Sequence, residues 1–381
     1  MFDAATDDRF MARALELARH AEGQTRPNPM VGAVIVSPAG EIVGEGWHRM
    51  AGLPHAEVEA LRALKAAGNS AVGATMYVTL EPCNHQGRTG PCSVAVIEAG
   101  ITRVVVAMRD PHRHASGGIE RLRAAGIAVE EGVRRGEAML LNPAFNTYHA
   151  IGRPMVTLKY AMTMDGCTSV PSGDSKWITG EAARHEVHIR RTRHDVILAG
   201  IETILRDDAR LTARNVPIPP GPALLRAVLD SRLRLPLDAP FLADSATSPA
   251  LIFCADDIPM LEDRAAEYIR RGAQVIPVAR RHEGLALDAV LKELYGRGVQ
   301  SISVEGGRRV AGSFLLDRFV DRIECWIAPR IAGGGLVHTG PITRPVFFER
   351  MELAEQVHHL SFSTYAPDFL IEGWLNNHLF V

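Results

Sequence analysis

Apolar stretches typical of β-strands alternate with helix-like segments along most of the 381 residues of this chain. In the first 150 residues a helix at 7–22 precedes a β-hairpin, and strands at 75–80 and 103–108 follow helices at 55–68 and 91–100. Units of this kind are connected by right-handed crossovers and pack into layers. The sequence therefore predicts a layered α/β domain at the N-terminus.

The segment LNPAFNTYHAIGRP (141–154) interrupts this alternation with two prolines and a glycine. A second series of expected strands follows, at 155–162, 195–200, 224–230, 251–255, 274–279, 301–307, 324–331 and 368–375. The chain is also longer than one hydrophobic core usually supports. We therefore expect two domains, 1–150 and 151–381, of which the second is again α/β with a strand order that the sequence leaves open.

The composition is that of an ordinary globular protein, with 46% hydrophobic residues, 23% charged residues and a formal net charge of −2. A balance so close to neutral does not point to a nucleic-acid or acidic-membrane partner. The acidic N-terminus lacks the pattern of a secretory signal, and no apolar run approaches the ~20 residues that cross a bilayer. We therefore expect a cytoplasmic protein with no nucleic-acid or membrane partner, and a homo-oligomer is compatible with the sequence.

Two of the five cysteines, Cys83 and Cys92, are separated by eight residues in the loop PCNHQGRTGPC (82–92). A disulfide is unusual in a reducing cytosol, and two cysteines alone are more often small core residues than ligands. His55, at the expected start of the helix 55–68, adds an imidazole to the two sulfurs. Three protein ligands with an open fourth position are typical of catalytic zinc, whereas structural zinc usually has four. The pattern therefore indicates a catalytic Zn²⁺ site.

Glu57 follows His55 by two residues in the first turn of the same expected helix. Residues two apart diverge in mid-helix, but at a helix start both side chains can lean over the helix end. One can then bind the metal while the other contacts its water, whose pKa zinc lowers toward ~7. Glu57 is therefore the expected catalytic proton shuttle, although taken alone it is typical of a solvated helix acid.

A His-x-Glu motif followed by Pro-Cys and a second cysteine is the signature of zinc-dependent deaminases, whose cysteines are usually only two residues apart. The longer separation here, together with RPNPMVGAVIV, HAEVEAL and YVTLEPCNHQGRTGPC, closely resembles the deaminase half of the bifunctional riboflavin-biosynthesis deaminase–reductase family. The resemblance covers nearly the whole chain and implies a cytidine-deaminase-like α/β/α domain. His85 and Arg88 match the family's loop motif, and a substrate or phosphate contact from them is an open alternative.

In the second half, no G-x-G-x-x-G or P-loop motif opens a helix after a strand, so a Rossmann domain is not indicated. The segment SISVEGGRRVAGSFLLDRF (301–319) instead predicts a strand, a Gly-Gly turn and an amphipathic helix. Such glycines either let the backbone approach a phosphate at the helix N-terminus or serve packing alone.

The segments LKYAMTMDG, SGDSKWITG, GIETILRDDARLTAR, VLDSR and VEGG resemble the reductase half of the same family, which implies a dihydrofolate-reductase-like fold and NADPH as cofactor. The resemblance places at the cofactor Met162, Trp177, Thr203, Asp207, Ser231, Gly307, Arg308, Arg309, Val310, Ala311, Gly312 and Ser313. It places at the substrate Ser175, Arg191, Leu211, Arg214 and Glu305. Arginines suit a ribose phosphate and a tryptophan suits a flat ring, yet each is also common as a core or helix-surface residue.

The resemblance implies a two-step function on a phosphorylated pyrimidine ribosyl compound: deamination of 2,5-diamino-6-(5-phosphoribosylamino)pyrimidin-4-one, then NADPH-dependent reduction of the ribosyl to the ribityl side chain. One alternative is a nucleoside or tRNA base deaminase with an unrelated C-terminal domain. Another is a binding module with a structural zinc, for which His85 is the obvious fourth ligand. In DPHRHASGG (110–118), His112 replaces an asparagine common in the family, so no contact from this loop is carried over.

Overall fold

The computed structural model describes residues 2–86, 90–170, 172, 174–281, 284–333 and 350–376. The chain divides into two compact units, a first that contains Met1–Gly152 and a second that contains Arg153–Ile218 and the described residues from Ala223 onward. Each unit has its own cluster of buried hydrophobic side chains.

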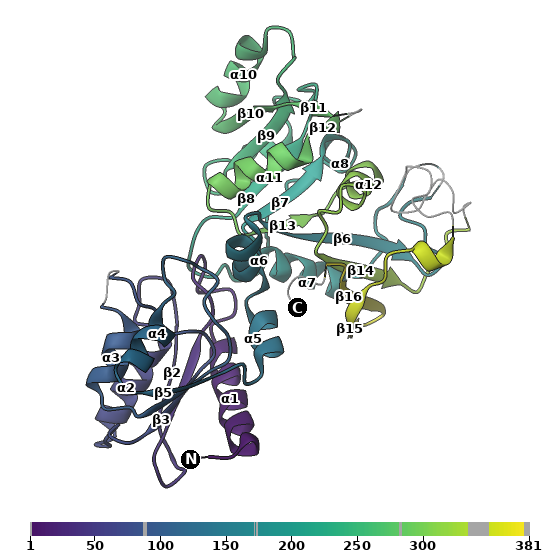
Figure 1. Cartoon of the computed structure of the whole chain (residues 1–381). Coiled ribbons are helices and arrows are strands. Elements are labelled where there is room, and N and C mark those ends of the chain that lie inside the picture. The colour runs from purple at the N-terminus through teal and green to yellow at the C-terminus, as the bar shows by residue number, and fades with distance from the viewer. Residues whose placement is uncertain are drawn as a thin grey trace. The chain divides into compact units, whose positions relative to one another are not determined.

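The first unit is a three-layer α/β/α domain around a five-stranded sheet (Figure 1). The strand order is β2-β1-β3-β4-β5, in which β1 is antiparallel to β2 and β3, whereas β3, β4 and β5 are parallel. Helices α2, α3 and α4 cover one face, and α1 and α5 lie on the other. The elements are α1 (Ala4–Arg19), β1 (Gly32–Val36), β2 (Ile42–Trp47), α2 (Ala56–Ala66), β3 (Thr75–Val78), α3 (Cys92–Glu98), β4 (Arg103–Val106), α4 (Gly118–Ala124), β5 (Ala128–Glu131), α5 (Arg135–Leu141) and α6 (Pro143–Ile151).

Close packing of α2 on strand β2 fixes where this helix begins. Gly46 of β2 lies so near the helix that a Cβ atom there would come within 2.4 Å of the Ala60 nitrogen. On the neighbouring strand, a Cβ atom on Gly32 would come within 2.0 Å of the Ala14 carbonyl oxygen in α1. No side chain fits at such distances, so the two glycines let both helices approach the sheet closely. The position of α2 in turn fixes that of His55, its N-cap residue.

The expected strands and helices of this unit are present, and the structure adds helices α4, α5 and α6 and strand β5. Most of the segment 141–154 is helical, because Pro143 occupies the first turn of α6, where a missing N–H group leaves no intrahelical bond unmade. Gly152 ends that helix in the left-handed conformation, with φ of 79°. Strand β5 has no counterpart among the expected strands, because its residues are mostly exposed and form no apolar run.

The second unit is built on a nine-stranded sheet of the order β10-β9-β8-β7-β13-β6-β14-β16-β15. Neighbouring strands are parallel from β10 to β14, and β14, β16 and β15 are antiparallel. The elements are β6 (Met155–Thr163), α7 (Glu181–Arg191), β7 (Val196–Gly200), α8 (Ile201–Asp207), β8 (Leu225–Leu229), α9 (Pro240–Ala243), β9 (Ala250–Ala255), α10 (Leu261–Arg270), β10 (Ala273–Val278), β11 (Arg280–Arg281), β12 (Gly284–Leu285), α11 (Leu287–Gly296), β13 (Ser301–Val304), α12 (Arg308–Leu316), β14 (Arg322–Ala328), η1 (Met351–Leu353), β15 (His358–Tyr365) and β16 (Asp368–Trp374).

Strand β13 lies between β6 and β7, although it follows them by more than a hundred residues in the sequence. Its register pairs Val304 with Leu158 of β6 and with Leu198 of β7. The residue after this strand, Glu305, therefore lies beside Lys159 of β6. All eight expected strands of this unit are present. The short strands β11 and β12 and the strand β15, whose residues are mostly exposed, were not expected.

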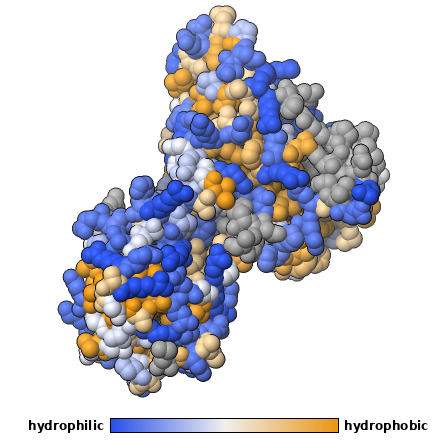
Figure 2. Space-filling model, in the orientation of Figure 1, coloured by the Kyte–Doolittle hydropathy of each residue, from blue (hydrophilic) through white to orange (hydrophobic). Residues whose placement is uncertain are grey.

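Polar and apolar residues are interspersed on the face of the molecule shown in Figure 2, where hydrophilic side chains separate the hydrophobic ones. Among the described residues, no helix has both the length and the apolar character that crossing a membrane requires.

Candidate active sites

Three separate segments of the first unit bring His55, Cys83 and Cys92 together. The Nδ1 atom of His55 lies 3.5 Å from the Cys83 sulfur and 3.3 Å from the Cys92 sulfur. The backbone N–H of Cys92, the first residue of α3, donates to the Cys83 sulfur at 3.4 Å. The ligand atoms all lie within 4.8 Å of one another, as binding of one metal ion requires. This is the cluster that the sequence pattern predicts.

The charges of the two thiols show why a cation suits this place. Hydrogen bonds from Cys92 and His55 lower the pKa of the Cys83 thiol, against the effect of its burial. Contact with Cys83, together with burial, raises the pKa of the Cys92 thiol. The pair therefore holds one negative charge readily, and a second thiolate needs a neighbouring positive charge. One imidazole and two sulfurs form a donor set that zinc prefers.

Glu57 is buried in the first turn of α2, with only 3% of its surface exposed. Burial raises the pKa of its carboxyl group to about 7. Glu57 also lines, with His55 and Cys83, a cavity of about 410 Å³. A carboxyl group that exchanges protons near neutral pH, beside the metal ligands and within reach of a small molecule, has the properties of a general acid–base catalyst.

Several other residues that line this cavity are not among the site residues that the sequence predicts. The Nε2 atom of His48 lies 3.1 Å from the Asn28 amide nitrogen, and its Nδ1 lies 3.1 Å from the Pro54 carbonyl oxygen. Burial raises the pKa of Asp110 to about 7, and its carboxylate accepts the His112 backbone N–H at 2.8 Å. A signal for both residues exists in the sequence, since His48 directly follows strand β2 and Asp110 closely follows strand β4, but neither matches a metal-ligand spacing.

His85 also lines the cavity, yet it is not part of the cluster of possible metal ligands within the described residues. The three-ligand set with an open position, rather than a closed four-ligand structural site, is therefore what this part of the chain forms. Arg88, the other loop residue singled out from the sequence, lies outside the described residues.

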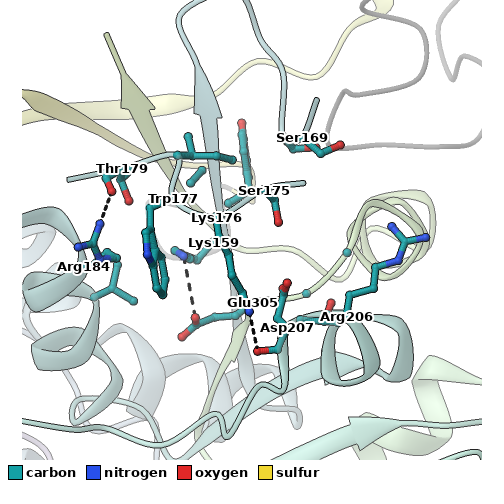
Figure 3. Close-up of a pocket in the computed structure, with 18 of the residues that line it drawn as sticks. Lys159, Ser169, Ser175, Lys176, Trp177, Thr179, Arg184, Arg206, Asp207 and Glu305 are labelled. Atoms are coloured by element: carbon teal, nitrogen blue, oxygen red, sulfur yellow. Dashed lines mark hydrogen bonds and ion pairs between the residues drawn. The ribbon is translucent and has the colours of Figure 1, made fainter. Parts of the chain in front are cut away.

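A second cavity, of about 1360 Å³, lies in the second unit (Figure 3). Arg191 donates from Nε and Nη2 to the two oxygens of Glu305, each at 2.8 Å, and from Nη1 to the Thr212 carbonyl oxygen at 2.8 Å. Lys159 points toward the same carboxylate, with its Nζ 4.0 Å away. Three of the five guanidinium N–H groups of Arg191 are thus engaged, so the residue positions Glu305 whether or not it also binds substrate.

The charges of these three buried groups are coupled. Burial opposes ionisation of Glu305, but Arg191 and then Lys159 outweigh it and lower the pKa of Glu305 to about 2. Burial lowers the pKa of Lys159, Glu305 opposes this shift, and Arg191 adds to it. Lys159 was not singled out from the sequence; its signal is a lysine within an otherwise apolar strand, MVTLKYAMT. Such a lysine is suited to proton transfer.

The Gly-Gly turn before α12 serves both packing and access to the cavity. A Cβ atom on Gly306 would come within 2.8 Å of the Ala199 Cα atom in β7, so this glycine lets the turn pack on the neighbouring strand. Gly307 has φ of 41°, in the left-handed region that favours glycine, and lines the cavity with Thr203 and Arg308.

Ten of the predicted reductase residues line this cavity: Ser175, Trp177, Arg191, Thr203, Asp207, Arg214, Glu305, Gly307, Arg308 and Ala311. The other seven are not among its lining residues: Met162, Leu211, Ser231, Arg309, Val310, Gly312 and Ser313. Trp177 stands with 61% of its surface exposed, and the Arg184 guanidinium lies 4.6 Å from its ring centre. A flat, accessible ring at the cavity is suited to stack on a flat part of a ligand.

A protein with these two units is a zinc-dependent deaminase joined to a reductase, and comparisons with known proteins agree. A family model described as the cytidine and deoxycytidylate deaminase zinc-binding region matches residues 4–108, and one described as the RibD C-terminal domain matches residues 154–364. The chain belongs to the RibD family of bifunctional enzymes of riboflavin biosynthesis, with a deaminase and a reductase activity.

The relatives match nearly the whole length of the chain. Riboflavin biosynthesis protein RibD of Aquifex aeolicus (strain VF5) is 45% identical over 332 residues, 87% of this chain and 89% of that protein. The protein of the same name from Synechocystis sp. is 39% identical over 372 residues, 97% of this chain and 96% of that protein. Among solved structures, Acinetobacter baumannii RibD (form 1) aligns with a TM-score of 0.83 and 33% identity, covering 98% of this chain and 100% of that one.

These matches confirm the cytidine-deaminase-like first domain, the dihydrofolate-reductase-like second domain, and zinc and NADPH as the cofactors of the family. They do not favour the alternative of a nucleoside or tRNA base deaminase with an unrelated C-terminal domain, since the C-terminal half matches the RibD C-terminal domain model.

Proposed function

We propose that the first unit deaminates 2,5-diamino-6-(5-phosphoribosylamino)pyrimidin-4-one and that the second unit reduces the ribosyl group of the product to ribityl. In this proposal the deaminase domain comprises residues 1–150 and the reductase domain residues 151–381. The observation that carries the first half is the cluster of His55, Cys83 and Cys92 next to the buried Glu57. The protein would work in the cytoplasm on this small molecule, with no nucleic-acid or membrane partner.

In the deamination, His55, Cys83 and Cys92 would hold the zinc ion, which when bound would lower the pKa of water toward ~7. Glu57 takes a proton from the attacking water and passes it to a ring nitrogen. It then passes the second proton to the leaving amino group, so that water and the amine are converted to a carbonyl group and ammonia. The raised pKa of Glu57 suits this exchange, because the group both accepts and donates protons near neutral pH.

In the reduction, bound NADPH would be the source of a hydride for the sugar carbon that is bonded to nitrogen. As the bond from this carbon to the ring oxygen breaks, the oxygen keeps the electron pair and needs a proton. Lys159 is the group that we assign to donate it, because its ammonium lies in the cavity beside Glu305 and burial lowers its pKa. Glu305 and Arg191 hold this lysine in place, Trp177 would stack on the cofactor, and Arg214 would bind the substrate phosphate.

Two assays on the purified protein test this proposal. Ammonia release from the diaminopyrimidinone ribosyl phosphate is expected without NADPH, and NADPH oxidation is expected only after the amino group has been removed. NADPH oxidation with the original substrate, in the absence of ammonia release, would contradict the order of the two steps.

A further inference from the structure

The deaminase cavity contains few groups that could balance the negative charge of a phosphorylated substrate. Its described lining includes no lysine or arginine, and its histidines are His48, His55, His85 and His112. His55 faces the two sulfurs through Nδ1. Both ring nitrogens of His48 are engaged, one by the Asn28 amide and the other by the Pro54 carbonyl, so neither is available to an anion. Only His85 and His112 remain for an anion in the described part of the lining.

Of these two imidazoles, His112 is the one that the structure holds in place. Its ring stacks on that of His149 in α6, with centroids 4.3 Å apart and an interplanar angle of 26°. His149 in turn packs edge-on against Phe145, at 4.5 Å. The backbone N–H of His112 is also bonded to the Asp110 carboxylate. His85, by contrast, is exposed.

The acidic groups of the same cavity do little to oppose an anion. The Glu81 carboxylate accepts three backbone N–H groups, from Asp110 at 3.1 Å, Gly117 at 2.9 Å and Ile119 at 3.2 Å. Burial raises the pKa of Asp110 to about 7, which reduces its negative charge near neutral pH. Burial, together with the neighbouring His114 and His85, lowers the pKa of His112, and a phosphate bound beside the ring would oppose this shift and favour the charged imidazole.

We propose that His112, fixed against His149, binds the phosphate group of the deaminase substrate. This inference rests on the proposed function and concerns a position at which this chain has a histidine in place of the asparagine common in the family. A charged imidazole can donate a hydrogen bond to a phosphate oxygen and offset its charge. The asparagine that is common at this position in the family can donate a hydrogen bond but carries no charge.

The test compares the phosphorylated substrate with its dephosphorylated riboside, by ammonia release without NADPH. His112→Asn is expected to lower kcat/KM for the phosphorylated substrate about tenfold more than for the riboside, the effect of one charge-assisted hydrogen bond. The matched control is His114→Asn, because His114 is exposed, lies next to His112 and does not line the cavity. An unchanged preference for the phosphorylated substrate in His112→Asn overturns the proposal.

A second pair of variants tests the stack and does not depend on how well His112→Asn folds. His149→Ala is expected to weaken the preference for the phosphorylated substrate, and His149→Phe, which keeps a flat ring, is expected to retain it. Equal losses in both variants would refute the role of the stack. If the unaltered protein releases no ammonia from either compound, the proposed function fails rather than the assignment of His112.

Discussion

Replacing Glu305 by Gln should separate the charge of this carboxylate from its shape. In the structure, Glu305 is the acidic partner of both Arg191 and Lys159, and its Oε2 atom lies 4.0 Å from the Lys159 ammonium. The substitution keeps the size of the side chain and removes the negative charge. It therefore leaves the positive charge of Arg191 unopposed beside Lys159, and the pKa of Lys159 must fall further.

The size of this effect follows from the geometry. Two unit charges 4.0 Å apart interact by about 4 kcal/mol at an effective dielectric constant of about 20, which corresponds to about 3 pKa units. The side chain of Lys159 is 20% exposed, so water screens part of this interaction. A decrease of at least about one unit in the pKa of Lys159 is therefore the expected result.

The assay is the pH profile of NADPH oxidation at saturating concentrations of the deaminated intermediate and NADPH. Lys159 donates a proton only below its pKa, so the rate is present at lower pH and lost as the pH rises through that value. In Glu305→Gln the alkaline limb should move to lower pH. Glu202→Gln is a matched control, because Glu202 lines the same cavity but pairs with the partly exposed Arg234. An alkaline limb that stays in place in Glu305→Gln would refute proton donation by Lys159.

Three further outcomes are expected. Lys159→Met should slow the reduction by about 10²- to 10⁴-fold while ammonia release continues, and reduction at the original rate would exclude Lys159 as the acid. Cys92→Ser should lower the zinc content per chain and abolish ammonia release, as metal analysis beside the activity assay would show. Arg226→Met should lower the melting temperature of the second unit far more than Arg270→Met, since Arg226 is fully buried and donates to three backbone carbonyls, each costing about 1–3 kcal/mol when left without a donor.

Much of the fold was predictable because most strands in both sheets are short apolar runs between turn residues. Strands β5 and β15 were not predictable in this way, since both are mostly exposed and carry no such run. The order of the nine-stranded sheet also could not be predicted, because the insertion of β13 between β6 and β7 depends on contacts between distant segments. Local pattern gives no information on such pairings.

The convergence of His55, Cys83 and Cys92 was predictable, because metal ligands must be of a few types and in a restricted spacing. The reductase site was harder to predict from the sequence. Lys159 acquires its importance only through its neighbours Glu305 and Arg191, which come from other segments of the sheet and from α7. The role of His112 also could not be recognised from the sequence. Its stacking partner His149 lies in helix α6, in a segment that the sequence indicated as a boundary between domains.

The central claim is that two separate sites, one centred on zinc and Glu57 and one on NADPH and Lys159, carry out the two reactions. The most direct test is Glu57→Gln, assayed for both reactions on the same preparation with its zinc content measured. The account predicts that ammonia release falls by about 10²- to 10⁴-fold while zinc stays bound and reduction of the deaminated intermediate continues at its original rate. Loss of both activities in a folded, zinc-containing protein would contradict it.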